Sequence, residues 1–176
     1  GGFGASTAIS GTPVYRDTSA WYHIVVSQDT TQATEANRLK MWLNGVQLTL
    51  TGIPAQNYQS GINNSVAHHI GKQYSQSEYW DGYIAEAHFI DGQALTPSSF
   101  GLTDSTTGVW SPKKYSGTYG TNGFYLPFSD LDSGTLTATS GPGFSTYYAG
   151  TFSTSKYVTW SGTTVGASSY TFECWF

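Results

Sequence analysis

Charged residues are scarce in this chain, and cysteine is almost absent. Asp, Glu, Lys and Arg make up only 10% of the 176 residues, and the formal net charge at pH 7 is −4. A negative net charge with few Lys and Arg residues gives no basic surface for nucleic acid, so we expect no nucleic-acid partner. The single cysteine, Cys174, has no second cysteine to pair with, which excludes a small scaffold held by internal disulfides.

Long apolar runs are missing as well. No stretch of 18 apolar residues occurs, so the sequence predicts no membrane-spanning helix and no membrane insertion. The opening Gly-Gly-Phe-Gly has neither the basic region nor the apolar region of a signal peptide. This start is typical of the interior of a longer sequence, and we expect the chain to be a fragment.

Aromatic and turn-forming residues are abundant instead. Aromatics reach 16% of the chain, with 13 Tyr and 6 Trp, and there are 21 Gly. This composition favours short strands joined by many turns over helices. Large aromatic side chains bury much area each, so a hydrophobic fraction of 38% is enough for a core. The expected class is all-β.

The best-defined local structure is a hairpin. Residues 38–43 and 46–50 both alternate between apolar and polar side chains, as half-buried strands do. Asn44 and Gly45 lie between them, and both tolerate the positive φ of a type I′ turn. The sequence therefore predicts a two-residue hairpin here.

Further strands are indicated by β-branched and aromatic runs. Pro127 cannot donate to a ladder, so the strand that contains it should lie at a sheet edge. Thr96-Pro97 is typical of the start of a short helical turn. The expected strands are 21–27, 68–72, 80–90, 124–128, the region around 156–160, and 170–176.

Four of these motifs, in this order, resemble the laminin-G-like, concanavalin-A-like jelly-roll family. They are the Trp-led strand 21–26, the Asn-Gly hairpin 39–45, the Ile-Gly pair 70–71, and the Gly-x-Ile-x-Glu strand 82–90 followed by Ala-Leu at 94–95. Ala85 departs from the family, whose members often carry Asp there. The resemblance implies an antiparallel β-sandwich. It also implies recognition of glycans or other surfaces, sometimes through calcium.

The resemblance divides the chain into three parts. Residues 1–100 correspond to a laminin-G-like sandwich without its first strands, and residues 101–145 to an aromatic and glycine-rich extension and linker. Residues 146–176 are either the opening strands of a second similar domain, which we favour, or strands that complete the first. Residues 110–128 resemble segments of bacteriophage tail and particle proteins. That likeness implies a virion or cell-surface location, with other copies or subunits of a particle as partners.

The carboxylates give no pattern for catalysis. A retaining glycosidase needs two carboxyl groups about 5–5.5 Å apart. The glucanase relatives carry Glu-x-Asp-x-Glu on one strand, and no such triplet occurs here. Glu86 and Asp91 fall on opposite faces of a straight strand. We therefore expect no enzyme and no catalytic residues, with Cys174 buried in an apolar strand.

Metal ligands are equally sparse. The four histidines are His23, His68, His69 and His88. The adjacent pair points to opposite faces of a strand and the other two are isolated in sequence, so no zinc site is predicted. Calcium needs several oxygen ligands, and Glu78 and Asp81 are the candidates. We expect no cofactor, with calcium at these two residues as the alternative.

The most specific positive hypothesis is a glycan site. Aromatic rings stack on the apolar faces of sugars, while amides and carboxylates bond the hydroxyls. Two loops that flank the Ile70 strand carry such residues, and we expect them to meet at one rim. The candidate ligand-binding residues are Asn63, Asn64, Gln73, Tyr74, Tyr79, Trp80 and Asp81. The alternative for Trp80, which we favour, is packing in the core.

A second aromatic cluster is expected to be a packed linker or a subunit contact. Its members are Trp110, Tyr115, Tyr119, Asn122 and Tyr125, beside Lys113 and Lys114. Taken together, the sequence predicts a non-catalytic module that recognises a host-surface glycan. The alternatives are a structural assembly module without a ligand and a polysaccharide-degrading enzyme of the same fold.

Overall fold

The computed structural model describes residues 8–9, 15–73, 78–128, 151–152, 158–161 and 169–176. In these ranges the regular structure is antiparallel β-sheet, with the 3₁₀ turns η1 (Glu35–Asn37) and η2 (Pro97–Ser99). This confirms the expected all-β sandwich class. No helix of the described part is long and apolar enough to cross a membrane.

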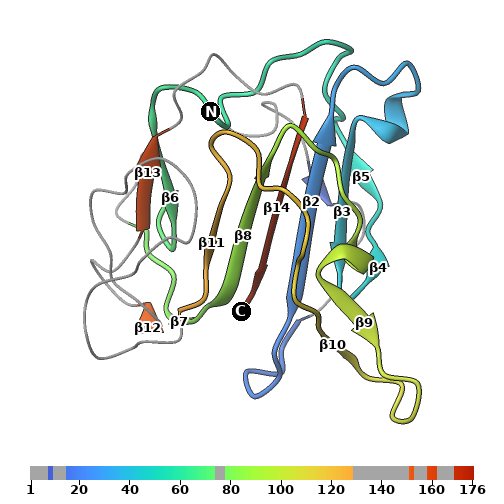
Figure 1. Cartoon of the computed structure of the whole chain (residues 1–176), viewed down its shortest axis with the longest axis vertical. Helices are drawn as coiled ribbons and strands as arrows, with labels where there is room; N and C mark the ends of the chain where they lie inside the picture. The colour runs from blue at the N-terminus through green and yellow to red at the C-terminus, as the bar shows by residue number, and fades with distance from the viewer. Residues whose placement is uncertain (1–7, 10–14, 74–77, 129–150, 153–157, 162–168) are drawn as a thin grey trace.

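A six-stranded antiparallel sheet forms the centre of the molecule (Figure 1). In spatial order its strands are β11 (Phe124–Leu126), β8 (Ala85–Asp91), β14 (Ser169–Trp175), β2 (His23–Asp29), β3 (Leu39–Leu43) and β4 (Val46–Gln47). The last strand of the chain, β14, lies in the middle, between β8 and β2. As expected, the strand before Pro127 is an edge strand, paired with β8.

Smaller strand pairs accompany this sheet. They are β6 (Ala67–Ile70) with β13 (Val158–Ser161), β7 (Gly82–Tyr83) with β12 (Thr151–Phe152), β9 (Gly101–Thr103) with β10 (Trp110–Pro112), and β1 (Ala8–Ile9) with β5 (Leu50–Thr51). In the view of Figure 1, β6 and β13 appear toward the β11 side of the sheet and β9 and β10 toward the β3 side, while Ile70 of β6 belongs to the same apolar cluster as Phe89 of β8. The expected linker 129–145 lies outside the described residues.

The two faces of the sheet hold two apolar clusters. Successive residues of a strand point to opposite faces, so Tyr170 and Cys174 of β14 join one cluster while Glu173 faces the other. The first cluster includes Ile70 of β6, and the second includes Phe100, just after η2. The glycine-rich stretch 102–122 therefore packs on the sheet through Tyr115 and Tyr119.

The predicted hairpin is confirmed. Asn44 and Gly45 have φ of 48° and 80°, and Leu43 pairs with Val46 across the turn. The Asn44 side chain also accepts a hydrogen bond from the backbone N–H of His23, at 2.8 Å. Thr96 precedes η2 as expected, but its hydroxyl pairs with Ser98 and does not cap the turn.

Substitution of Gly45 by alanine is expected to lower the free energy of unfolding by about 2 kcal/mol. The alanine would have to keep the positive φ of Gly45, and its Cβ would lie 2.9 Å from two ring carbons of Trp110. Gly92→Ala is the matched control, because Gly92 has φ of 81° and open space around it. Urea denaturation should give a cost of about 1 kcal/mol for the control. Equal costs for the two variants would contradict the contact with Trp110.

Candidate functional site

A surface groove lies at the end of the sheet where β2 begins and β14 ends. There Tyr22 and Phe176 exchange two backbone hydrogen bonds, of 2.8 and 2.9 Å. One wall is the segment 15–22 and the other is the segment 80–83, with Phe176 between them, and the volume is about 620 Å³. We call this feature the aromatic groove.

Exposed aromatic side chains dominate the groove. Trp21 is 51% exposed, Tyr83 60% and Trp80 40%, and Tyr15 is similarly open. Large aromatic side chains are usually buried, so several exposed ones around one hollow form a surface that is suited to contact with another molecule. The exposed faces are flat and apolar, which is the shape that the face of a sugar ring requires.

The rings are held in a continuous row. The ring centroids of Tyr15 and Tyr22 are 5.6 Å apart, those of Tyr22 and Phe176 5.9 Å, and those of Phe176 and Trp80 5.3 Å. Offset and edge-on contacts of this length are the favourable ones for aromatic pairs. The row therefore fixes the positions of both walls relative to the sheet.

Polar groups sit beside the rings. The Asp17 carboxylate accepts hydrogen bonds from the backbone N–H and the hydroxyl of Ser19, at 2.9 and 2.6 Å, and these bonds lower the pKa of Asp17. They order the segment that carries Tyr15 and Trp21. Arg16 and Asp81 lie on opposite walls and supply a donor and an acceptor for hydroxyl or charged groups.

The structure brings together only part of the predicted glycan site. Trp80 and Asp81 line the aromatic groove, while Gln73 and Tyr79 line an adjoining apolar cavity together with Trp80. Tyr74 lies outside the described residues. The expectation that Trp80 packs in the core is wrong, because this side chain forms the wall shared by the two hollows.

Asn63 and Asn64 lie elsewhere. Asn63 is buried and donates a 2.8 Å hydrogen bond to Asp91, the last residue of β8, whereas Asp81 precedes that strand. Asn64 is half-buried beside it, with its side-chain oxygen bonded to the N–H of Ser65. The two loops therefore do not meet at one rim, because loops that flank a strand leave from its opposite ends.

The two calcium candidates line different hollows. Glu78 lines the apolar cavity and Asp81 lines the aromatic groove. Within the described ranges, which leave out the neighbouring 74–77, no three His, Cys, Asp or Glu side chains form a group that could hold a metal ion. His68 is buried, while its neighbour His69 lines the cavity.

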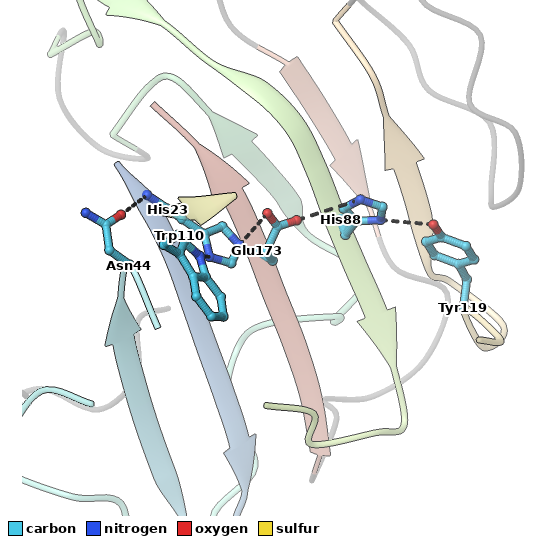
Figure 2. A network of polar contacts seen from close by, with 6 residues as sticks. All are labelled: His23, Asn44, His88, Trp110, Tyr119 and Glu173. Carbon is cyan, nitrogen blue, oxygen red and sulfur yellow. Dashed lines mark hydrogen bonds and ion pairs between the residues drawn. The ribbon is translucent and has the colours of Figure 1, made fainter. Parts of the chain in front are cut away.

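A buried polar network crosses three adjacent strands of the central sheet (Figure 2). It lies on the face that carries Glu173, opposite the face that carries Tyr170 and Cys174. Glu173 of β14 lies between His23 of β2 and His88 of β8, and the three side chains are 1%, 0% and 5% exposed. Nε2 of His23 is 2.7 Å from Oε1 of Glu173, and Nε2 of His88 is 3.8 Å from Oε2. The two imidazoles thus lie next to different oxygens of the Glu173 carboxyl group.

Trp110 fixes the protonation of His23. Its indole N–H donates to Nδ1 of His23 at 2.9 Å, so this nitrogen must carry a lone pair. The proton of the neutral ring then lies on Nε2, which donates to Glu173. The contact is therefore a hydrogen bond from a neutral imidazole and not an ion pair. Burial lowers the pKa of His23 to about 4, consistent with this assignment.

His88 lies inside an aromatic cage. Its Nδ1 is 2.9 Å from the Tyr119 hydroxyl, and its ring stacks on Tyr125 with centroids 4.4 Å apart. Phe100 and Tyr115 complete the cage. Burial, with a smaller effect of His23, lowers the pKa of His88 to about 4. The second aromatic cluster of the sequence is thus packed over the sheet, and the Tyr119 hydroxyl and the Trp110 indole fasten the 100–122 segment to His88 and His23.

Glu173 is held as a buried acid. Burial is the main cause that raises its pKa well above the ordinary value, and Glu86 adds to the effect. Among the residues that the structure describes, none forms a hydrogen bond with Oε2. A carboxyl covered by this many rings does not meet a substrate, so we assign the network a structural role.

Sequence reasoning missed this network, although one signal was present. His23, Glu173 and His88 all lie within strands rich in apolar residues, on the same face as apolar side chains such as Val25, Trp175 and Ile90. A polar residue at such a position usually needs a polar partner. What the sequence did not supply was the neighbour relation of the three strands.

Fold and groove define an all-β antiparallel sandwich with an aromatic-lined surface groove. Comparisons with protein-family models, curated proteins and solved structures found no match for this chain.

Proposed function

We propose that the chain is a non-catalytic carbohydrate-binding module whose sugar site is the aromatic groove. The observation that carries the proposal is the set of exposed aromatic side chains, Trp21, Trp80 and Tyr83, that line a hollow of about 620 Å³. Hollows of this volume are typical of small-ligand sites. The polar groups Arg16 and Asp81 on the two walls would orient the sugar through its hydroxyls.

The particle or cell-surface setting implied by the family resemblance belongs to the same proposal. A host-surface glycan would be the ligand there, and other subunits of the particle would be the protein partners. The groove differs from the sequence-predicted site in its first wall, since the segment 15–22 replaces the loop that carries Asn63 and Asn64.

The test is a glycan array probed with the labelled chain, with and without EDTA. Trp21→Ala and Tyr83→Ala are each expected to weaken binding by about 5-fold to 150-fold, because stacking on an aromatic ring contributes about 1–3 kcal/mol per ring. Tyr58→Ala is the matched control. Tyr58 is also an exposed aromatic, and its carbonyl bonds Thr30 just beyond the far end of β2.

Equal losses in the control and in the groove variants would contradict the proposed site. Sensitivity to EDTA would show that calcium takes part. Failure of the folded chain to bind any glycan would favour the structural assembly module, for which the exposed rings would instead be buried by another subunit.

A further inference from the structure

An apolar cavity of about 610 Å³ adjoins the aromatic groove. Its floor is the face of the central sheet that carries Ile24, Phe172 and Cys174, and its opposite side includes Ile62 and Ile70. Tyr79 and Trp80 close one end. The polar side chains at its border, such as Lys72 and Glu78, belong to the segment that follows β6.

This cavity opens to the surface and its walls are almost entirely apolar, so it is not an ordinary packing defect of the interior. Protein interiors are packed as densely as organic crystals, with few voids larger than one water molecule. Water gains little in such a space, because a buried water needs two to four polar partners and these walls are mainly aliphatic and aromatic. A hollow of this volume lies in the range of ligand sites, which are mostly apolar with a few polar groups at one side.

The cavity and the aromatic groove share two side chains. Trp80 and Phe176 line both, and their rings meet edge-on with centroids 5.3 Å apart. A single molecule with a polar part and an apolar part can therefore contact both hollows across this pair of rings. A free glycan would fill only the groove.

We propose that the apolar cavity binds the alkyl or acyl chain of an amphipathic glycoconjugate whose sugar lies in the aromatic groove. The inference rests on the proposed function for the sugar part, while the binding of the chain rests on the cavity alone. The ligand class is thus a glycolipid or a similar alkylated saccharide.

Two series of probes separate these parts. Hexyl, octyl and decyl β-glucosides are titrated into the protein below their critical micelle concentrations, and so are triethylene glycol ethers with the same alkyl chains. We expect the affinity of both series to rise about fourfold per added methylene, because burial of a methylene contributes about that factor. We also expect the glucosides to bind more tightly than the ethers.

Variants that fill the cavity give the structural check. Ile24→Phe and Ile62→Phe add volume from opposite sides at partly buried positions, so at least one should fold, as judged by near-UV circular dichroism. Each folded variant should lose the dependence on chain length. Val46→Phe, at an exposed position of β4, should keep it.

The outcomes distinguish the two proposals. Affinity that is independent of chain length, or no binding by either series, would overturn the cavity inference and indicate that the chain itself fills this space. A normal chain-length dependence with equal affinity for glucosides and ethers would support the cavity and contradict the sugar groove for this glycoside.

Discussion

Replacement of Gly101 by alanine is expected to lower the free energy of unfolding by about 3 kcal/mol. A Cβ at Gly101 would lie 2.3 Å from Cζ2 and 2.5 Å from Cε2 of Trp110, which is far inside van der Waals contact. The indole cannot move away without loss, because its N–H donates to His23 and its ring stacks on that imidazole at 5.8 Å. The clash thus acts directly on the contact that fastens β10 to the sheet.

Urea denaturation followed by circular dichroism measures this effect, with Gly108→Ala as the control. Gly108 lies in the same β9–β10 connection with φ of 71°, and no atom lies within 4 Å of the point that an alanine Cβ would occupy. Only backbone strain of about 1 kcal/mol is therefore expected for the control. In a Trp110→Ala background, Gly101→Ala should cost less than about 0.5 kcal/mol. Full additivity of the two substitutions would contradict a direct clash.

Replacement of Glu173 by glutamine is expected to change how stability depends on pH. In the wild-type protein, the two histidines and Glu173 change the stability in opposite directions as the pH changes. His23 and His88 have pKa values of about 4 when folded against an ordinary value of 6.5, so the unfolded chain binds protons first as the pH falls. Stability from the histidines is therefore complete above pH 6.5 and is lost as the pH falls toward 4.

Glu173 acts in the opposite direction. Its folded pKa is raised above the ordinary 4.5, so the folded carboxyl binds a proton at a higher pH than the unfolded one. Its contribution to stability is complete below pH 4.5 and is lost as the pH rises through the folded pKa. Acidification from neutral pH thus removes histidine stability and restores part of it through Glu173.

The Glu173→Gln substitution removes the contribution of Glu173 to the pH dependence of stability and leaves that of the two histidines. The glutamine amide oxygen can accept the bond from Nε2 of His23, and the amide group stays neutral at every pH. Between the folded pKa of Glu173 and pH 4.5, the stability of the variant should fall more steeply on acidification than that of the wild type, by about 1.4 kcal/mol per pH unit for one proton. Above the folded pKa of Glu173 the variant should be the more stable protein.

Denaturation curves at half-unit intervals from pH 4.5 to 8 test this expectation. Glu86→Gln is the comparison, since Glu86 influences the pKa of Glu173 without being buried beside the two histidines. The Glu86→Gln variant should keep most of the dependence of stability on pH that the wild-type protein shows. Parallel profiles for the wild type and Glu173→Gln would show that Glu173 stays ionised in the folded protein over this range, and would contradict the assignment of a buried acid.

Local structure was largely readable from the sequence. The alternation of residues 38–43 and 46–50 and the Asn44-Gly45 pair predicted a hairpin, and the structure confirms its turn and the pairing beside it. The second strand is shorter than predicted, because it ends at Gln47 and Leu50 pairs with β1 instead. The β-branched run at 21–27 gave β2 with a shift of two residues. These features depend on side-chain period and on φ preferences, which are properties of a few consecutive residues.

The candidate site was predicted only in part, and the reason is again physical. Trp80 and Asp81 were among the candidate ligand-binding residues and do line the groove, although packing in the core was the favoured expectation for Trp80. Tyr15 and Trp21 were not among the candidates, because their role depends on the segment 80–83 lying opposite them. Asn63 was misplaced, since sequence proximity to a strand does not say at which end of the sheet a loop lies.

By itself the sequence determined the all-β class, the hairpin and the abundance of aromatic side chains without a catalytic carboxylate pattern. Only the tertiary structure decided that β14 lies between β2 and β8, which places Glu173 against His23, 150 residues away in the chain. Strand alternation fixes which face a residue occupies, but every strand with the same alternation satisfies it equally well. The choice of neighbour comes from packing over the whole sheet, and with it come both the buried network and the groove.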